Sequence, residues 1–231
     1  MTNKYGLALH TTSPQLGLVL DNFQGEARSQ TWDLGQEMGN QLHLKLMEIM
    51  ENCTWQDLSF LAVAIGPGSF TGTRLGVVTA RTLAQQLDLP LIGISSFAAF
   101  AWWWVYEHPL EFGQILALHT PAQRDQLFVG IYQLTADPKN PLKTLLPDMV
   151  MTPPEWQEKL QGLELGNELG DLASTLPVIS LEVSQNLGMT APSLLDLAYH
   201  QQRFSKGEAT LTGRDFPWSL VLPFYGQHPV A

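Results

Sequence analysis

The stretch of this sequence whose residue types most clearly suggest chemistry is a glycine-rich loop at residues 66–72, which reads GPGSFTG. It follows an apolar run at residues 61–65 and precedes residues 73–87, whose apolar side chains recur at helical spacing. Backbone N–H groups that lead into a helix N-terminus can cradle an anion. The candidates for such a phosphate loop are Gly66, Gly68, Ser69, Thr71 and Gly72.

Two common phosphate-binding motifs do not fit this loop. A P-loop requires Lys and then Ser or Thr after its last glycine, but Thr73 and Arg74 follow Gly72. The dinucleotide-binding motif requires a third glycine where Thr71 stands. A second interpretation therefore stays open, in which the loop is a tight turn and Ser69 or Thr71 caps the helix.

The segments around the loop predict one lobe of an α/β protein. An apolar run at residues 91–95 follows the helix, so strand, loop, helix and strand form a βαβ unit. Upstream, the pattern predicts three strands and a helix, at residues 5–11, 16–21, 26–32 and 36–51. This order is typical of the ribonuclease-H-like lobe of actin-like proteins, an assignment by analogy of fold.

An internal repeat predicts a second lobe. The sequence LALHT occurs at residues 7–11 and again at 116–120, each time before another apolar run. Further strands and helices are expected at residues 127–132, 145–151, from 153, 168–175, 177–181 and 192–202. We therefore predict an α/β fold with two actin-like lobes and mixed sheets, at residues 1–106 and 107–231. Which lobe the C-terminal segment packs on stays open.

Composition and charge restrict the classes of function. The net charge is −10, from 12 Lys and Arg against 22 Asp and Glu, so the chain has no overall basic character for binding a nucleic acid by itself. A single cysteine, Cys53, excludes an internal disulfide and fits a reducing compartment. No apolar run approaches the length that spans a membrane, and the N-terminus lacks the apolar region of a signal peptide, which predicts a cytoplasmic protein.

The loop and its neighbours closely resemble the TsaB (YeaZ) family. The resemblance rests on GPGSFTG-x-R-x-G at residues 66–76, the alanine-rich helix after it and GISS at residues 93–96. PFYG at residues 223–226 is similar to the family's C-terminal motif. The family implies a dimerisation subunit of the bacterial complex that transfers threonylcarbamoyl to the adenosine beside the anticodon of tRNA.

The residues that are missing argue against catalysis by this chain. Members of the family usually carry Asp-Thr-Ser in the first hairpin, but His10, Thr11 and Thr12 stand there. His119 replaces the Asp of a second family motif, and Arg124 is displaced from that motif by a few residues. Neutral imidazole is a poor magnesium ligand, so His10 and His119 form either a transition-metal pair or two structural histidines, and we prefer the second. The His-x-x-x-His pair of the catalytic TsaD paralogue is also missing from the sequence, so no catalytic or metal residue is predicted.

The resemblance also implies partners. They are a TsaD-like catalytic paralogue, a TsaE-like ATPase and a second copy of the chain, with tRNA reached only through the complex. No cofactor is expected, except ATP or ADP at an interface with partner subunits. The alternative function is a small actin-like ATPase or phosphotransferase that uses the GPGSFTG loop, and a third class is a peptidase.

The predicted partner interface lies on two helices of the first lobe. On the helix at 73–87, the larger residues Leu75, Val78, Leu83 and Leu87 are expected to pack inward and to leave a ridge of small residues on the surface. The predicted interface residues are Leu44, Met47, Arg74, Gly76, Val77, Ala80 and Ala84. The alternative is that the small ridge packs against the neighbouring helix within the lobe.

Overall fold

The computed structural model describes residues 5–164, 177–205 and 217–226. By its own contacts the chain divides into two compact units, neither of which is continuous in sequence. Unit 1 comprises residues 1–103 and 185–224, and unit 2 comprises residues 104–184 and 225–231. The first boundary lies close to the predicted division after residue 106, while most of the C-terminal segment belongs to unit 1.

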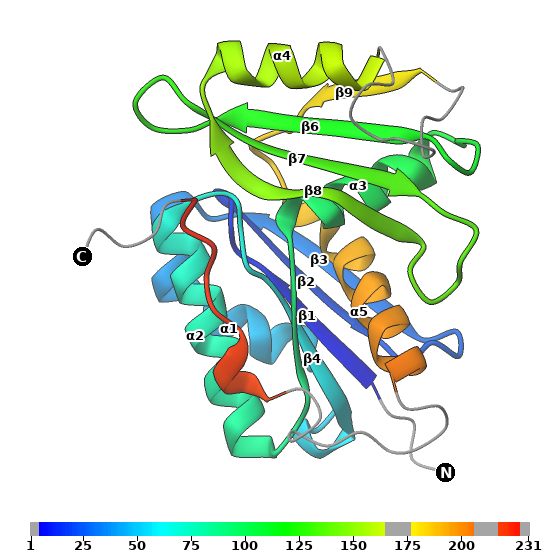
Figure 1. Cartoon of the computed structure of the whole chain (residues 1–231). Coiled ribbons are helices and arrows are strands. Elements are labelled where there is room, and N and C mark those ends of the chain that lie inside the picture. The colour runs from blue at the N-terminus through cyan, green and yellow to red at the C-terminus, as the bar shows by residue number, and fades with distance from the viewer. Residues whose placement is uncertain (1–4, 165–176, 206–216, 227–231) are drawn as a thin grey trace. The chain divides into compact units, whose positions relative to one another are not determined.

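Unit 1 is a five-stranded mixed sheet with helices on both faces. Its order is β3-β2-β1-β4-β5, in which β2 runs antiparallel to β1 and β3, and β1, β4 and β5 are parallel. The strands are β1 (Tyr5–His10), β2 (Gln15–Asp21), β3 (Ala27–Asp33), β4 (Leu58–Ala64) and β5 (Leu91–Ile94). Helices α1 (Met38–Ile49) and α2 (Phe70–Leu87) cover one face, and α5 (Ala191–Ser205) covers the other (Figure 1).

Alternation along β1 explains how both faces of this sheet are covered. Leu7 and Leu9 belong to the apolar core that α1 and α2 complete. The opposite face of β1, on which Gly6 lies, is close to Leu195 of α5. A strand that is buried on both faces needs an almost continuous apolar run, which β1 and β4 both have.

Local sequence signals set the ends of several elements. Thr54 and Asp57 form the predicted capping box before β4, where the Thr54 N–H donates to Asp57 Oδ2 at 2.9 Å. Asp88 adopts a left-handed conformation at the end of α2, and Pro90 follows. Helix α3 (Ser96–Glu107) contains three consecutive tryptophans at residues 102–104. It begins with Ser95 Oγ accepting from the N–H groups of Phe97 and Ala98.

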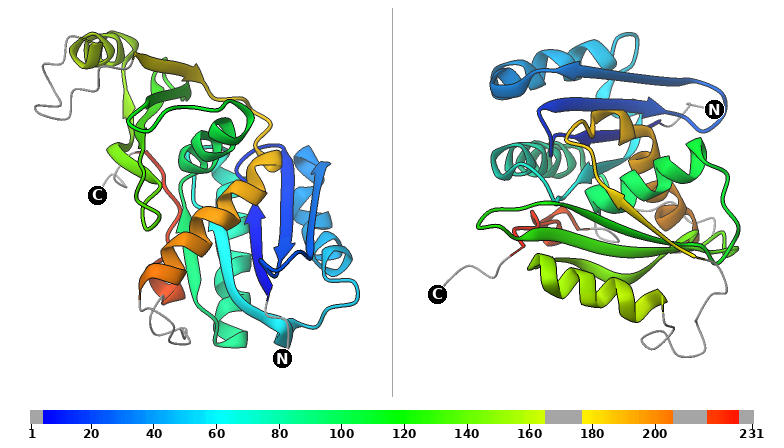
Figure 2. Two further views of the ribbon diagram at one scale, coloured as in Figure 1. Left: turned by 90° about the vertical axis from the view of Figure 1, so that its right-hand side faces the viewer. Right: turned by 90° about the horizontal axis from the view of Figure 1, so that it is seen from above.

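Unit 2 is a four-stranded mixed sheet of order β8-β7-β6-β9. Its elements are β6 (Ile115–Pro121), β7 (Leu127–Leu134), β8 (Leu142–Met151), α4 (Pro153–Glu164) and β9 (Val178–Glu182). Both views of Figure 2 show α4 along one face of the sheet. Ile115, Ala117, Val129 and Ile131 pack there against Trp156 and Leu163 of α4. The short helix expected at residues 168–175 lies outside the described residues.

The two units share one order of elements, and the predicted fold class is confirmed. In each, three antiparallel strands are followed by a helix and by a strand that pairs in parallel with the first. Residues 7–10 of the first LALHT segment lie in β1 and the whole second segment lies in β6, the first strand of each hairpin. Among the described residues, no helix is long and apolar enough to cross a membrane.

Candidate functional site

The GPGSFTG loop lies at the carboxyl end of β4 and leads directly into α2. Ser69 is the N-cap residue of this helix, because its Oγ accepts from the Gly72 N–H at 3.2 Å. Thr73 Oγ1 returns a hydrogen bond to the Ser69 carbonyl at 2.7 Å. The capping interpretation of Ser69 is therefore confirmed.

The turn between β1 and β2 packs tightly against this loop. The Ser69 N–H donates to the Thr12 carbonyl at 2.6 Å. A Cβ atom on Gly68 would lie 2.2 Å from the same carbonyl oxygen, so only glycine allows the approach. The Thr12 carbonyl oxygen already accepts the hydrogen bond of the Ser69 N–H, which a phosphate would need. This weakens the phosphate interpretation of Gly66, Gly68, Ser69, Thr71 and Gly72.

Buried hydroxyl groups connect the same turn to two helices. Thr11 Oγ1 donates to the Gly72 carbonyl at 2.8 Å, and Thr12 Oγ1 lies 2.9 Å from Ser96 Oγ. The Ser96 N–H donates in turn to the Gly66 carbonyl at 2.8 Å. This network fixes the start of α2 relative to the sheet, so the surface of α2 is presented by a rigid support.

His10 ends β1 and is completely buried. Neither of its ring nitrogens has a hydrogen-bond partner among the described residues, and burial lowers its pKa to about 3. The imidazole is therefore neutral near pH 7. In the described part of the chain, no three His, Cys, Asp or Glu side chains gather as a metal site, so neither His10 nor His119 belongs to such a group.

The predicted orientation of α2 was wrong. Gly76, Val77, Ala80 and Ala84 are buried inside unit 1 and cannot form a partner surface in this fold. Gly76 shows the reason, since a Cβ atom there would lie 2.1 Å from Thr11 Oγ1. The small residues permit close packing of α2 on the sheet and its first turn, and not on the neighbouring helix as the alternative supposed.

The surface of α1 and α2 instead presents large apolar side chains. The exposed fraction is 48% for Leu44 and 67% for Met47 on α1, and 54% for Phe70 and 62% for Val78 on α2. We call these four residues the helical patch. Leu44 and Met47 were predicted. Val78 was missed because it was assigned to the core, and Phe70 was missed because the predicted helix began at residue 73.

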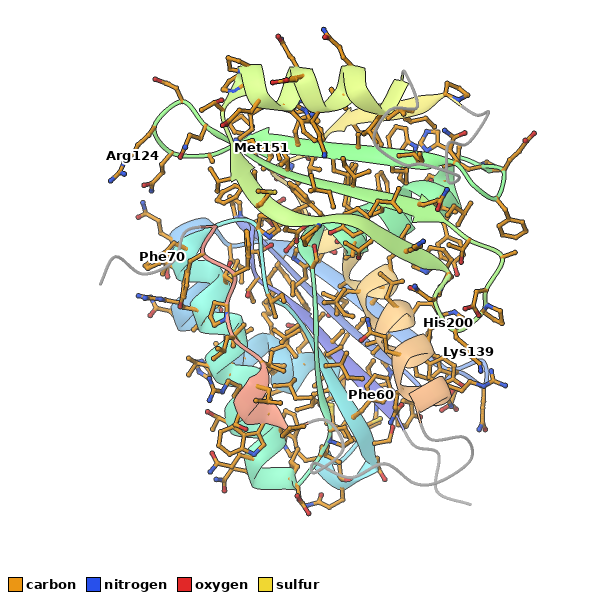
Figure 3. All side chains as sticks on the ribbon, in the orientation of Figure 1. Phe60, Phe70, Arg124, Lys139, Met151 and His200 are labelled. Carbon is orange, nitrogen blue, oxygen red and sulfur yellow. The ribbon has the colours of Figure 1, made fainter. Side chains whose placement is uncertain are left out.

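Two arginines accompany this surface. The Arg74 guanidinium lies 3.9 Å from the centre of the Phe70 ring, and the Arg81 guanidinium lies 5.4 Å from that of Trp218. Helix α2 has no acidic residue between Phe70 and Leu87, although the chain carries a net charge of −10. Figure 3 shows Phe70 at the surface near the start of α2. The spacing of Phe70, Arg74 and Val78 at i, i+4 and i+8 was the sequence signal for this face.

In unit 2, the predicted residues His119 and Arg124 belong to the β6–β7 hairpin. His119 is only partly buried, but its Nδ1 is buried and has no partner among the described residues. Its ring centre lies 6.2 Å from that of Trp156. Arg124 lies in the turn of the hairpin, after the end of the strand that contains His119, and has a positive φ of 58°.

Comparison with known proteins gives consistent matches. The model of the family TsaD, described as tRNA N6-adenosine threonylcarbamoyltransferase, matches residues 41–156, half of the chain. A Bacillus subtilis protein named tRNA threonylcarbamoyladenosine biosynthesis protein TsaB is 37% identical over 107 residues, which are 46% of this chain and 43% of that protein. The Escherichia coli protein of the same name is 47% identical over 45 residues, 20% of each chain. The matched region spans less than half of these curated relatives.

Solved structures extend the likeness to the whole fold. A structure described as YeaZ from Pseudomonas aeruginosa has a TM-score of 0.69 and 20% identity, and the match covers 96% of this chain and 99% of that one. A second structure, described as an uncharacterized protein with similarity to peptidase YEAZ from the same organism, has a TM-score of 0.70 and 20% identity over 97% and 100% of the two chains. At this identity the likeness concerns the fold.

Proposed function

Because the chain belongs to the TsaB (YeaZ) family, we propose that it is a non-catalytic subunit of the complex that transfers threonylcarbamoyl to an adenosine of tRNA. In this role it binds a TsaD-like catalytic paralogue and pairs with a second copy of itself when alone. A TsaE-like ATPase is a further partner, and the complex works in the cytoplasm. The observation that carries the proposal is the helical patch on a rigidly supported α2.

The helical patch has the properties of a protein interface. Four large apolar side chains, Leu44, Met47, Phe70 and Val78, are each about half exposed or more. Aromatic residues, methionine and arginine are enriched at such interfaces, and Arg74 beside Phe70 adds a cation to the apolar surface. The hydroxyl network at Thr11 and Thr12 holds the start of α2 in place, which reduces the ordering cost of binding.

Two features argue against the alternative, a small actin-like ATPase or phosphotransferase. The Ser69 N–H is already taken by the Thr12 carbonyl, and the residue that ends β1 is a neutral, buried histidine rather than a metal-binding carboxylate. With a net charge of −10, the chain is expected to reach tRNA only through its partners. ATP or ADP is expected only at an interface with a partner subunit.

The first test separates a scaffold from an enzyme. The purified chain is incubated with Mg·ATP and, separately, with a panel of peptides. We expect hydrolysis no faster than the buffer control in both cases. Turnover that survives repurification and falls in the Ser69→Ala variant would contradict the scaffold role.

The second test addresses the interface. Val78→Arg and Met47→Arg are compared with Met149→Arg, which places the same charge on a partly exposed methionine of unit 2. We expect the first two variants to keep their circular dichroism and to bind the organism's own TsaD-like protein at least tenfold more weakly, because an unpaired charge in a packed interface is costly. Equal affinity in all three variants would place the interface elsewhere.

A further inference from the structure

Two buried ring nitrogens in unit 2 have no partner among the described residues. One is Nε1 of Trp156, whose side chain is 97% buried, since the residue is only 3% exposed. The other is Nδ1 of His119. The two rings come from α4 and β6, and their centres are 6.2 Å apart with the planes inclined at 48°.

The surroundings of the Trp156 ring are apolar. The cluster around Trp156 consists of Ile115, Ala117, Val129, Ile131 and Leu163, none of which has a side-chain polar atom. A buried polar atom without a partner costs about 1–3 kcal/mol, and native proteins leave few such atoms unsatisfied. Two of them in neighbouring rings therefore indicate a shared ligand.

The chemistry of the rings defines that ligand. The indole N–H of Trp156 can only donate, so the ligand must accept a hydrogen bond. In the tautomer that has its proton on Nε2, His119 Nδ1 can only accept, and a ligand shared with Trp156 must then also donate. A water molecule does both. With two ordinary hydrogen bonds it would hold the nitrogens about 5 Å apart, which is compatible with the separation of the ring centres.

We propose that one internal water molecule binds between Trp156 Nε1 and His119 Nδ1 and joins the first turn of α4 to the end of β6. His119 is partly exposed, which gives water a route to the site. The site belongs to unit 2 alone, and it does not depend on the function proposed above.

A crystal structure that shows ordered water tests the proposal directly. We expect one water within about 3.2 Å of both nitrogens. A direct hydrogen bond between the rings, or two nitrogens that bond to protein groups, would overturn it. In solution near pH 8, the Trp156 indole N–H should show a cross-relaxation signal to a long-lived water, and the His119→Phe variant should lose that signal. A signal that persists unchanged in His119→Phe would also overturn it.

Double-mutant cycles give an independent measurement. Trp156→Phe and His119→Phe should be strongly non-additive, with a coupling of about fivefold or more in the unfolding equilibrium constant, because either substitution alone removes the bridge. Additive effects at Trp156 and His119 would refute the bridge.

Discussion

The first strands of the two units both begin an LALHT segment, yet they place its residues differently. In β1, Leu7 and Leu9 face the core that α1 and α2 cover, so His10 lies on the opposite face, on which α5 packs. In β6, Ala117 faces the core that α4 covers, and His119 is beside Trp156 of that helix. The two LALHT segments therefore present opposite faces to the helix that follows the third strand.

This difference shows that five identical residues do not specify which face of a strand is covered. Side chains alternate along a strand, so a shift of one residue exchanges the two faces. His10 is completely buried in unit 1, whereas His119 is partly exposed in unit 2. The surrounding elements, and not the shared residues, decide which environment each histidine has.

The largest expected effect concerns the residue opposite each histidine. Gly17 pairs with His10, and Val129 pairs with His119. A Cβ atom on Gly17 would lie 1.9 Å from the Gly188 carbonyl oxygen, so Gly17→Ala should lower the free energy of unfolding by about 3 kcal/mol or more. Val129→Ala only shortens a buried side chain and should cost about 2 kcal/mol. Urea denaturation measures both, and a normal midpoint for Gly17→Ala would show that the Gly188 backbone can move.

The next effect is a dependence of stability on pH. Burial lowers the pKa of His10 to about 3, while unfolded histidine titrates near 6.5. Below pH 6.5 the unfolded state binds a proton that the folded state does not, so stability present above that pH is lost as the pH falls towards 3. The loss should reach about 3 kcal/mol at pH 4.5.

Unfolding measured at pH 7.5 and pH 4.5 checks this dependence. The His10→Leu variant should lose less stability than the wild type between these values, because it has no buried imidazole to protonate. An identical loss in His10→Leu would show that other groups cause the acid sensitivity.

The smallest effect compares the threonines that end the two LALHT segments. Thr11 Oγ1 donates to the Gly72 carbonyl at 2.8 Å in a buried site, and Thr120 Oγ1 donates to the Val183 carbonyl at 3.3 Å in a partly buried one. Thr11→Val should cost about 1.5 kcal/mol and Thr120→Val about 0.5 kcal/mol, since a shorter buried hydrogen bond is harder to replace. Equal costs would show that the two hydrogen bonds contribute equally to stability.

Much of the fold could be predicted from local patterns. Alternation and helical spacing placed the strands of both units and the helices α1, α2, α4 and α5, although α3 was not predicted. The capping signals at Ser69 and at Thr54 with Asp57 were read correctly. These features depend on residues a few positions apart. The order of residues within each segment therefore contains the information needed to locate these strands, helices and caps.

The orientation of α2 could not be predicted in this way. Val78 is more apolar than Gly76 or Ala80, so a pattern of hydrophobicity assigns it to the core. Gly76 is buried because the turn at Thr11 comes close to it, and Ala80 is buried in the core of unit 1; both contacts join segments far apart in sequence. Val78 on the surface was missed for the same reason. The neutral state of His10 likewise depends on packing that no local pattern contains.

Unit 1 begins with β1 and is completed by α5, which comes from near the other end of the chain. During synthesis at about 5–20 residues per second, the face of the sheet that α5 covers must wait on the order of 10 to 40 s for that helix to emerge. Until then, the surface around Ala8 and Phe60 has no cover from α5, whereas all the described strands of unit 2 are made before α5. During this period, the uncovered surface of the nascent chain is open to a chaperone or to a second nascent chain, which then competes with α5.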